Sequence, residues 1–232
     1  MSKPQHPACA KCVTRICQPR DKYTKERPDI EDAPDFCPMK LDKEAFEKAA
    51  PEYLKEDVRH FAQQSSIQEF QCYEHVEGGI RTRFPRIEET IQFARKMGYK
   101  KLGLVFCAGL HNEALALTKI FEKKGFEIVS VCCKTGLVPK EELGLKPEQK
   151  IQGPEYFEGM CNPIAQAEII NQEKPDWVMM VGLCVGHDTM FLKYCKQPVT
   201  CLAVKDRVTG HNPLAALYLS NSYYRRLMSG EE

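Results

Sequence analysis

Cysteine is the residue type in this sequence with the greatest capacity for chemistry. The chain of 232 residues contains 12 Cys. In a reducing compartment, thiols at this density predict metal, cluster or redox chemistry rather than structural disulfides. The alternative is that the thiols serve as small buried apolar side chains, a role that cysteine fills well. Their spacing therefore decides which of them are candidates for a site.

Four cysteines lie in an N-terminal segment with almost no aliphatic side chains. Their spacing is C-x2-C-x4-C-x19-C, with Pro38 after the last of them: Cys9, Cys12, Cys17 and Cys37. Such a segment buries too little apolar surface to order itself, whereas a metal bound by four thiolates can order it. Zinc is the usual metal of four-Cys sites, but the Cys-Pro ending is shared with bacterial ferredoxin motifs. The spacing also resembles the four-cysteine module of corrinoid iron–sulfur proteins. We predict a [4Fe-4S] cluster here, with zinc as the alternative.

A second set of cysteines is associated with the ends of predicted strands. Three of them follow strands and one precedes a helix start at Asn162-Pro163: Cys107, Cys133, Cys184 and Cys161. The carboxyl ends of parallel strands meet at one edge of a sheet, and the start of a helix lowers the pKa of a thiol. We therefore predict that these four bind a second cluster. The alternative is that they cap the core, a role that we expect for Cys132 and Cys201.

Polar side chains follow the same strand ends. The candidates for catalytic roles are His187, Lys205, Asp206 and His211. Lys134, Lys205 and Arg207 are cations that suit an anionic ligand or the negative charge of a cluster. The alternatives are hydrogen-bonded structural histidines and an internal ion-pair network within residues 205–207.

The elements that must position these groups fall into three regions. Residues 1–40 form the cysteine-rich segment, residues 41–84 a helical linker, and residues 85–232 a domain that carries the second cysteine set. In the last region, predicted strands alternate with predicted helices. The strands are 102–106, 126–131, 177–183 and 199–204, and the helices are 87–98, 113–124, 163–172 and 213–228. This alternation predicts an α/β fold, with a small parallel sheet of about four strands and flanking helices, Rossmann-like or flavodoxin-like.

Composition and missing motifs exclude several classes of function. Basic and acidic residues number 33 and 32, for a net charge of +1, so no nucleic-acid partner is expected. The longest apolar run, residues 177–186, is too short to span a bilayer, and residues 1–12 lack the apolar core of a signal peptide. We expect a cytoplasmic protein with no membrane partner. Neither G-x-G-x-x-G nor G-x-x-x-x-G-K-[ST] occurs, which excludes ordinary dinucleotide and P-loop sites. The expected partner is a small-molecule substrate or an electron-transfer protein.

Four segments of the chain resemble an uncharacterised cysteine-rich family of anaerobic bacteria and archaea whose members are predicted to bind metal. The segments are FCAGL at 106–110, MCNPI at 160–164, VGLCVGHD at 181–188 and KDRVTGHNP at 205–213. The resemblance covers nearly the whole chain. It implies metal binding and an anaerobic setting, and it implies no particular reaction.

Three functions are compatible with these residues. The first is an iron–sulfur redox enzyme in which the N-terminal cluster passes electrons to a cluster at the sheet edge. The second is a non-redox cluster enzyme, similar to desulfidases, in which three Cys leave one iron open as a Lewis acid or sulfur acceptor. The third is a zinc-stabilised module that binds a small molecule without chemistry. Iron and acid-labile sulfide distinguish the third function from the other two.

Overall fold

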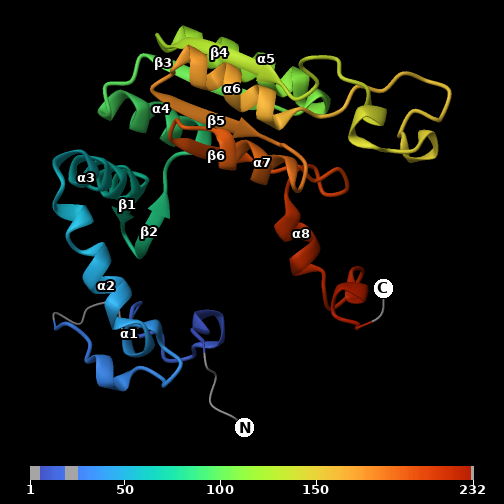
Figure 1. Cartoon of the computed structure of the whole chain (residues 1–232). Coiled ribbons are helices and arrows are strands. Elements are labelled where there is room, and N and C mark those ends of the chain that lie inside the picture. The colour runs from blue at the N-terminus through green and yellow to red at the C-terminus, as the bar shows by residue number, and fades with distance from the viewer. Residues whose placement is uncertain (1–5, 19–25, 231–232) are drawn as a thin grey trace. The chain divides into compact units, whose positions relative to one another are not determined.

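The structure is a computed structural model that describes residues 6–18 and 26–230 (Figure 1). The chain divides into two compact units, one up to Ile67 and the other from Gln68 onward. Each unit is described by itself.

The first unit consists of short helices. Its elements are η1 (Cys9–Lys11), η2 (Ile30–Asp32), α1 (Pro38–Leu41), α2 (Lys43–Ala49), η3 (Glu52–Leu54) and most of α3 (Glu56–Gln71). Among its described residues, Ala33 and Cys37 are the only buried apolar side chains. Phe46 and Leu54, by contrast, are 50% and 75% exposed. This unit therefore has little apolar core of its own.

The second unit begins with a hairpin that the sequence analysis did not predict. Strands β1 (Tyr73–Val76) and β2 (Gly79–Thr82) pair in antiparallel fashion around Gly78, whose φ is 87°. Val76 is opposite Gly79, so the turn consists of Glu77 and Gly78, and the positive φ of Gly78 allows the chain to reverse there. The hairpin lies in the region that was expected to be a helical linker.

The centre of the second unit is a four-stranded parallel sheet, as predicted. Its strands are β3 (Lys101–Phe106), β4 (Glu127–Cys132), β5 (Trp177–Val181) and β6 (Val199–Ala203), in the order β4-β3-β5-β6. Phe106 is in register with Cys132 on one side and with Val181 on the other. The residues that follow these three strands therefore stand at the same edge of the sheet.

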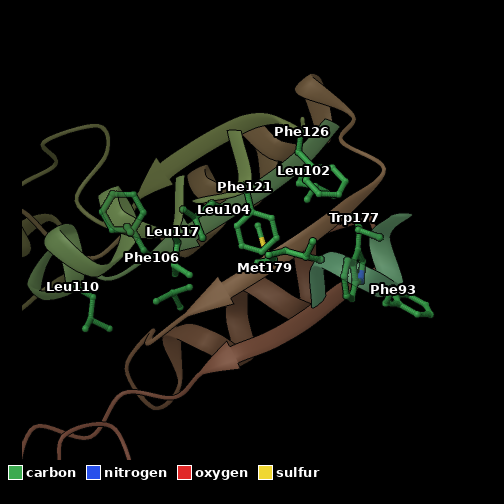
Figure 2. Packing of buried hydrophobic residues seen from close by; sticks show 14 residues of the cluster. Phe93, Leu102, Leu104, Phe106, Leu110, Leu117, Phe121, Phe126, Trp177 and Met179 are labelled. Atoms are coloured by element: carbon green, nitrogen blue, oxygen red, sulfur yellow. The ribbon is translucent and has the colours of Figure 1, made fainter. Parts of the chain in front are cut away.

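Helices cover both faces of the sheet. On one face, α4 (Arg86–Lys96) and α5 (His111–Lys123) pack Phe93, Leu117 and Phe121 against Leu104 and Met179 (Figure 2). On the other face, α6 (Pro163–Glu173) and α7 (His187–Tyr194) bury Ile170 and Phe191 against Val105 and Val178. No helix in the described ranges is long and apolar enough to cross a bilayer.

Two elements are shorter than the sequence patterns predict. The third strand was expected to reach residue 183 but ends at Val181, because Gly182 has a φ of 65° and leaves the extended conformation. The last helix, α8 (Pro213–Tyr218), was expected to reach residue 228 but ends ten residues earlier, and turns and η7 (Arg225–Leu227) follow it.

Replacing Gly182 with Ala should destabilise the second unit strongly. A Cβ atom there would lie 2.0 Å from Leu110 Cδ1, in addition to the strain of the positive φ. Gly186→Ala is the matched control, because Gly186 has a φ of 86° and open space around it. We expect the Gly182 variant to lose roughly 1–3 kcal/mol more unfolding free energy than the control, measured by urea denaturation. Equal losses would show that Leu110 moves aside without cost.

Candidate functional site

Cys107 and Cys133 lie side by side at the carboxyl edge of the sheet. Cys107 follows β3 and donates its backbone N–H to the Val181 carbonyl at 3.2 Å, and Cys133 follows β4 and donates to the Phe106 carbonyl at 2.9 Å. Both side chains are buried. The two thiols thus follow adjacent strands, and the backbone N–H groups of their residues continue the hydrogen-bond ladder of the sheet.

Cys161 joins these two through the start of α6. The Asn162 N–H donates to the Cys133 carbonyl at 2.7 Å, which places the residue before α6 against the end of β4. The Asn162 side chain caps the helix by accepting from the Ala165 N–H. The Cys133 thiol is hydrogen-bonded to the thiols of both Cys107 and Cys161. Three of the four cysteines predicted for the second site therefore form one connected group, called here the rim thiols.

The rim thiols divide their protons unequally. The hydrogen bond from Cys133 lowers the pKa of Cys107 to about 5, helped by the Gly109 N–H and the Lys205 ammonium and opposed by burial. The hydrogen bond from Cys133 likewise lowers the pKa of Cys161 to about 6, with further help from Lys134 and His187. The Cys133 thiol must stay protonated to donate to Cys107 and Cys161, so its own pKa is raised. Ionisation of the group is therefore favoured at Cys107 and Cys161 and disfavoured at Cys133.

Cys184, the fourth member of the predicted set, has a different partner. It is the third residue after β5 and accepts a hydrogen bond from Arg207 Nη2 at 3.0 Å. Because Gly182 turns the chain at the end of β5, the Cys184 thiol lies beside the loop that follows β6. The structure therefore groups Cys107, Cys133 and Cys161 and places Cys184 with a cation.

Two of the predicted polar residues face the rim thiols. His187 begins α7 and acts electrostatically on Cys161, and its buried Nδ1 atom has no hydrogen-bond partner among the residues that the structure describes. The Lys205 ammonium interacts with the Cys107 thiol and lies over Gly109, where a Cβ atom would be only 3.0 Å from Lys205 Nζ. These two residues are placed to interact with anything that the thiols bind.

Asp206 and His211 hold the loop after β6. The Asp206 carboxylate accepts the N–H groups of Val208 and Thr209 at 2.9 and 3.0 Å. His211 Nδ1 accepts the Asp206 N–H at 3.1 Å. Both residues thus have a structural task in the loop that presents Lys205 and Arg207, whatever else they do.

The long connection between Cys133 and Cys161 is organised by Glu158, which the sequence analysis did not single out. The buried Glu158 carboxylate pairs with Lys140 at 2.6 Å and accepts the Ile151 N–H at 2.7 Å. Lys134 donates to the Gly159 carbonyl and lies 3.9 Å from Glu158. The connection also contains η5 (Lys140–Leu143) and η6 (Pro147–Gln149). In the sequence, Glu158 is one acidic residue among several lysines of this connection. No local pattern distinguishes it from the other carboxylates there.

Buried polar contacts tie α6 to the sheet below the rim thiols. Gln166 is fully buried, and its side-chain amide donates to the carbonyls of Phe106 and Val131 at 3.3 and 2.8 Å. These carbonyls belong to the last residue of β3 and the last but one of β4. Gln166 therefore fixes the strand ends from which Cys107 and Cys133 project.

The N-terminal cysteines are partly brought together by the backbone. The Ala8 N–H donates to the Phe36 carbonyl at 3.4 Å, which joins the residues before Cys9 and Cys37. The Cys12 thiol contacts the Thr14 hydroxyl and accepts the Arg15 N–H, and the pKa of Cys12 is lowered by these two bonds in that order. Cys17 is exposed.

Neither cysteine set is a finished coordination shell in this structure. Within residues 6–18 and 26–230, no group of three or more His, Cys, Asp or Glu side chains is arranged to hold a metal ion. The chemistry of the rim thiols nevertheless suits a soft metal, because thiolates are its ligands and a bound metal takes the place of the shared proton. The predicted clusters therefore stay predictions, and they are taken up below as a proposal.

Thiols away from the rim behave as core side chains. Burial raises the pKa of Cys72, Cys195 and Cys201. Cys201 is directed to the Ala203 carbonyl within β6, in agreement with its expected place in the core. These residues provide internal controls for the rim thiols.

The titration of Cys107 is a direct test of this arrangement. The measurement is the difference in thiolate absorbance between the wild type and Cys107→Ser, both without metal. This difference should titrate with a midpoint near 5, so that Cys107 is a thiolate above that pH and a thiol below it. Lys205→Met should move the midpoint upward, because it removes a nearby positive charge. The corresponding difference for Cys195→Ser should titrate above the ordinary value of 9.0, because burial disfavours that thiolate. A Cys107 midpoint near the ordinary thiol value would contradict the hydrogen-bonded group.

Comparison with known proteins agrees with the expected resemblance to an uncharacterised cysteine-rich family. Residues 37–202 match a family described as a protein of unknown function, DUF1847. An uncharacterised protein of Methanocaldococcus jannaschii, MJ0455, is 42% identical over 189 residues, which cover 82% of this chain and 91% of that protein. The matched region contains Cys37 and the rim thiols and ends before Lys205. The chain is therefore a member of the DUF1847 family.

Proposed function

We propose that this protein is an iron–sulfur enzyme whose rim thiols bind a metal cluster beside a place for a small molecule. The observation that carries the proposal is the connected group of Cys107, Cys133 and Cys161, which comes from three separate elements and contains two thiols of depressed pKa. Core-capping thiols have no need of such contacts. By contrast, burial raises the pKa of Cys72, Cys195 and Cys201, which lie outside this group.

The charges around the rim thiols support a thiolate-rich cofactor. Lys205 and Lys134 contribute to the lowered pKa values of Cys107 and Cys161. Cations from different loops around buried thiolates offset the charge that several thiolate ligands bring. Soft thiolate ligands select iron–sulfur clusters or zinc over hard cations, and a [4Fe-4S] cluster is the form that we propose, with zinc as the alternative.

The separate position of Cys184 favours a site that three cysteines hold. Its thiol is directed to Arg207, so one coordination position of a cubane is left for another ligand. When bound, a cluster of this kind supplies a Lewis-acidic iron or an acceptor for sulfur. Lys205 and Arg207 bind and orient the reacting molecule. His187, whose Nδ1 atom has no hydrogen-bond partner among the described residues, acts on Cys161 and can exchange a proton there.

A redox enzyme is the other form of this proposal, with electrons delivered from an N-terminal cluster on Cys9, Cys12, Cys17 and Cys37. The backbone contact that joins the residues before Cys9 and Cys37 supports a metal site there. A reduction potential within the physiological range at both sites favours electron transfer. An irreducible rim cluster favours the non-redox enzyme.

A second candidate function follows from the contact between Cys107 and Cys133 alone. The Cys107 thiolate can attack a disulfide substrate to give a mixed disulfide and one released thiol. Cys133 then attacks the Cys107 sulfur, which releases the second thiol and leaves a Cys107–Cys133 disulfide. This thiol–disulfide exchange requires no metal, and a protein that is isolated anaerobically without metal but with this disulfide supports it.

Metal and sulfide analysis tests the rim site. In anaerobically purified protein, Cys161→Ser should lower bound iron by about four atoms, one cubane's content, or lower zinc by about one atom if the metal is zinc. Cys201→Ser is the control, because Cys201 is a half-buried core thiol, and it should retain the full metal content. Equal metal content in both variants and the wild type would refute the rim site.

The N-terminal site should be independent of the second unit. A Cys9→Ser/Cys12→Ser variant is expected to lose one site's metal while its remaining helix signal still unfolds cooperatively in urea. The reason is that the second unit has a two-sided apolar core of its own. Loss of cooperative unfolding in this variant would mean that the two units fold as one.

A further inference from the structure

The strand order places the switch point of the sheet between β3 and β5. The chain leaves β3 through α5 to reach β4 on one side, and it returns through α6 to β5 on the other side of β3. In open parallel sheets, ligands bind outside the carboxyl ends of the strands where the order reverses in this way. Here that point lies between Cys107, after β3, and Gly182, after β5.

Two glycines leave room for Lys205 at this point. A Cβ atom on Gly109 would lie 3.0 Å from Lys205 Nζ and 4.0 Å from Cys107 Sγ. A Cβ atom on Gly182 would lie 3.8 Å from Lys205 Cδ. The Lys205 side chain therefore extends from the loop after β6 across the ends of β5 and β3, and its ammonium reaches the rim thiols.

Lys205 and Arg207 lack acidic partners. Within the described part of the chain, no carboxylate lies within 4.0 Å of either cation, whereas Lys134 and Lys140 both face Glu158. The nearby Asp206 uses its carboxylate for the N–H groups of its own loop. The recorded partners of these two cations are thiols, Cys107 for Lys205 and Cys184 for Arg207.

The two cations at this switch point, Arg207 and Lys205, suit a carboxylate. A guanidinium matches a carboxylate through two parallel N–H groups, and an ammonium adds a point charge. Phosphate sites at the start of a helix rely on free backbone N–H groups. At the start of α7 these groups are taken, because Asp188 Oδ1 accepts from Gly186 and Thr189, and the His187 and Asp188 N–H groups donate to the Cys184 carbonyl. The Gly109 N–H serves the Cys107 thiol.

We infer that the switch point between β3 and β5 binds the carboxylate of a small organic acid through Arg207 and Lys205, beside the thiols of Cys184 and Cys107. This assignment names the substrate class of the proposed enzyme and rests on the proposed function for the reaction, but the binding is measured separately. A ligand held there presents the atoms next to its carboxylate to the rim thiols. The substrate is therefore a short acid that reacts close to its carboxylate.

Iodoacetate and iodoacetamide provide matched probes, because they differ in the carboxylate that one carries and the other lacks. With anaerobically isolated protein, mass spectrometry can measure the alkylation rate of Cys184 by each reagent, relative to a free model thiol. We expect iodoacetate to be favoured at Cys184 and its rate to saturate. Acetate should compete, and inorganic phosphate at equal ionic strength should not.

Arg207→Gln and Lys205→Gln should each reduce the preference for iodoacetate by roughly tenfold or more, the range for lost hydrogen bonds between charged groups. Arg207→Lys should recover only part of it, because it restores the charge without the planar fork. Lys196→Gln removes an exposed lysine elsewhere and should leave the preference unchanged. If both reagents leave Cys184 unmodified, calorimetric titration with acetate in the wild type and Arg207→Gln decides the matter.

Several outcomes would overturn the inference. They are a preference for iodoacetate no greater than that of the free thiol, a preference retained in both Gln variants, equal competition by phosphate, and no heat of acetate binding where the titration is needed. Metal content separates this result from the proposed function, because Arg207 contacts only the Cys184 thiol and Arg207→Gln should keep the wild-type metal. If the preference for iodoacetate is missing while the metal content is full, the carboxylate inference is wrong and the cluster proposal stands. A preserved preference in a protein without metal defeats the cluster alone.

Discussion

The parallel pairing of β3 with both β4 and β5 determines where every group of the candidate site lies. Because Phe106 is in register with Cys132 and Val181, the chain leaves three strands at one level. The Cys107 and Cys133 N–H groups extend the ladder by one further bond each. The thiols are thus positioned by the backbone of the sheet, the most rigid part of the unit, and the loops need only bring Cys161, Lys205 and Arg207 to them.

Electrostatics then decides how these groups behave. Three thiols in contact and largely withdrawn from water cannot all ionise without cost, so one of them keeps a proton and its neighbours become thiolates. Lys205, Lys134 and the Gly109 N–H stabilise that charge from separate loops. A site of this kind is ready to exchange its shared proton for a soft metal, and its unpaired cations attract an anion. The proposed metal site and the proposed carboxylate site therefore both rest on the same local excess of positive charge.

The two units differ in what holds them together. The second has apolar clusters on both faces of its sheet, whereas the described part of the first buries only Ala33 and Cys37 as apolar side chains. In place of such apolar clusters, the first unit contains four thiols. Metal ligation at Cys9, Cys12, Cys17 and Cys37 would provide the stabilisation that apolar burial does not, and this difference separates the physical roles of the two cysteine sets.

The periodicity of the chain was sufficient to predict an α/β fold with four parallel strands, because alternating apolar strands and amphipathic helices are local patterns. The ends of the predicted strands nominated Cys107, Cys133 and Cys184, and the predicted helix start at Asn162-Pro163 nominated Cys161. Local pattern could not separate Cys184 from the other three, because the turn at Gly182 and the reach of Arg207 depend on contacts with Leu110 and the loop after β6. Nor could it find the hairpin in the presumed linker or the buried Glu158. Sequence determined which residues could do chemistry; only the tertiary structure decided which of them meet, because burial, register and long-range hydrogen bonds join residues that no local spacing relates.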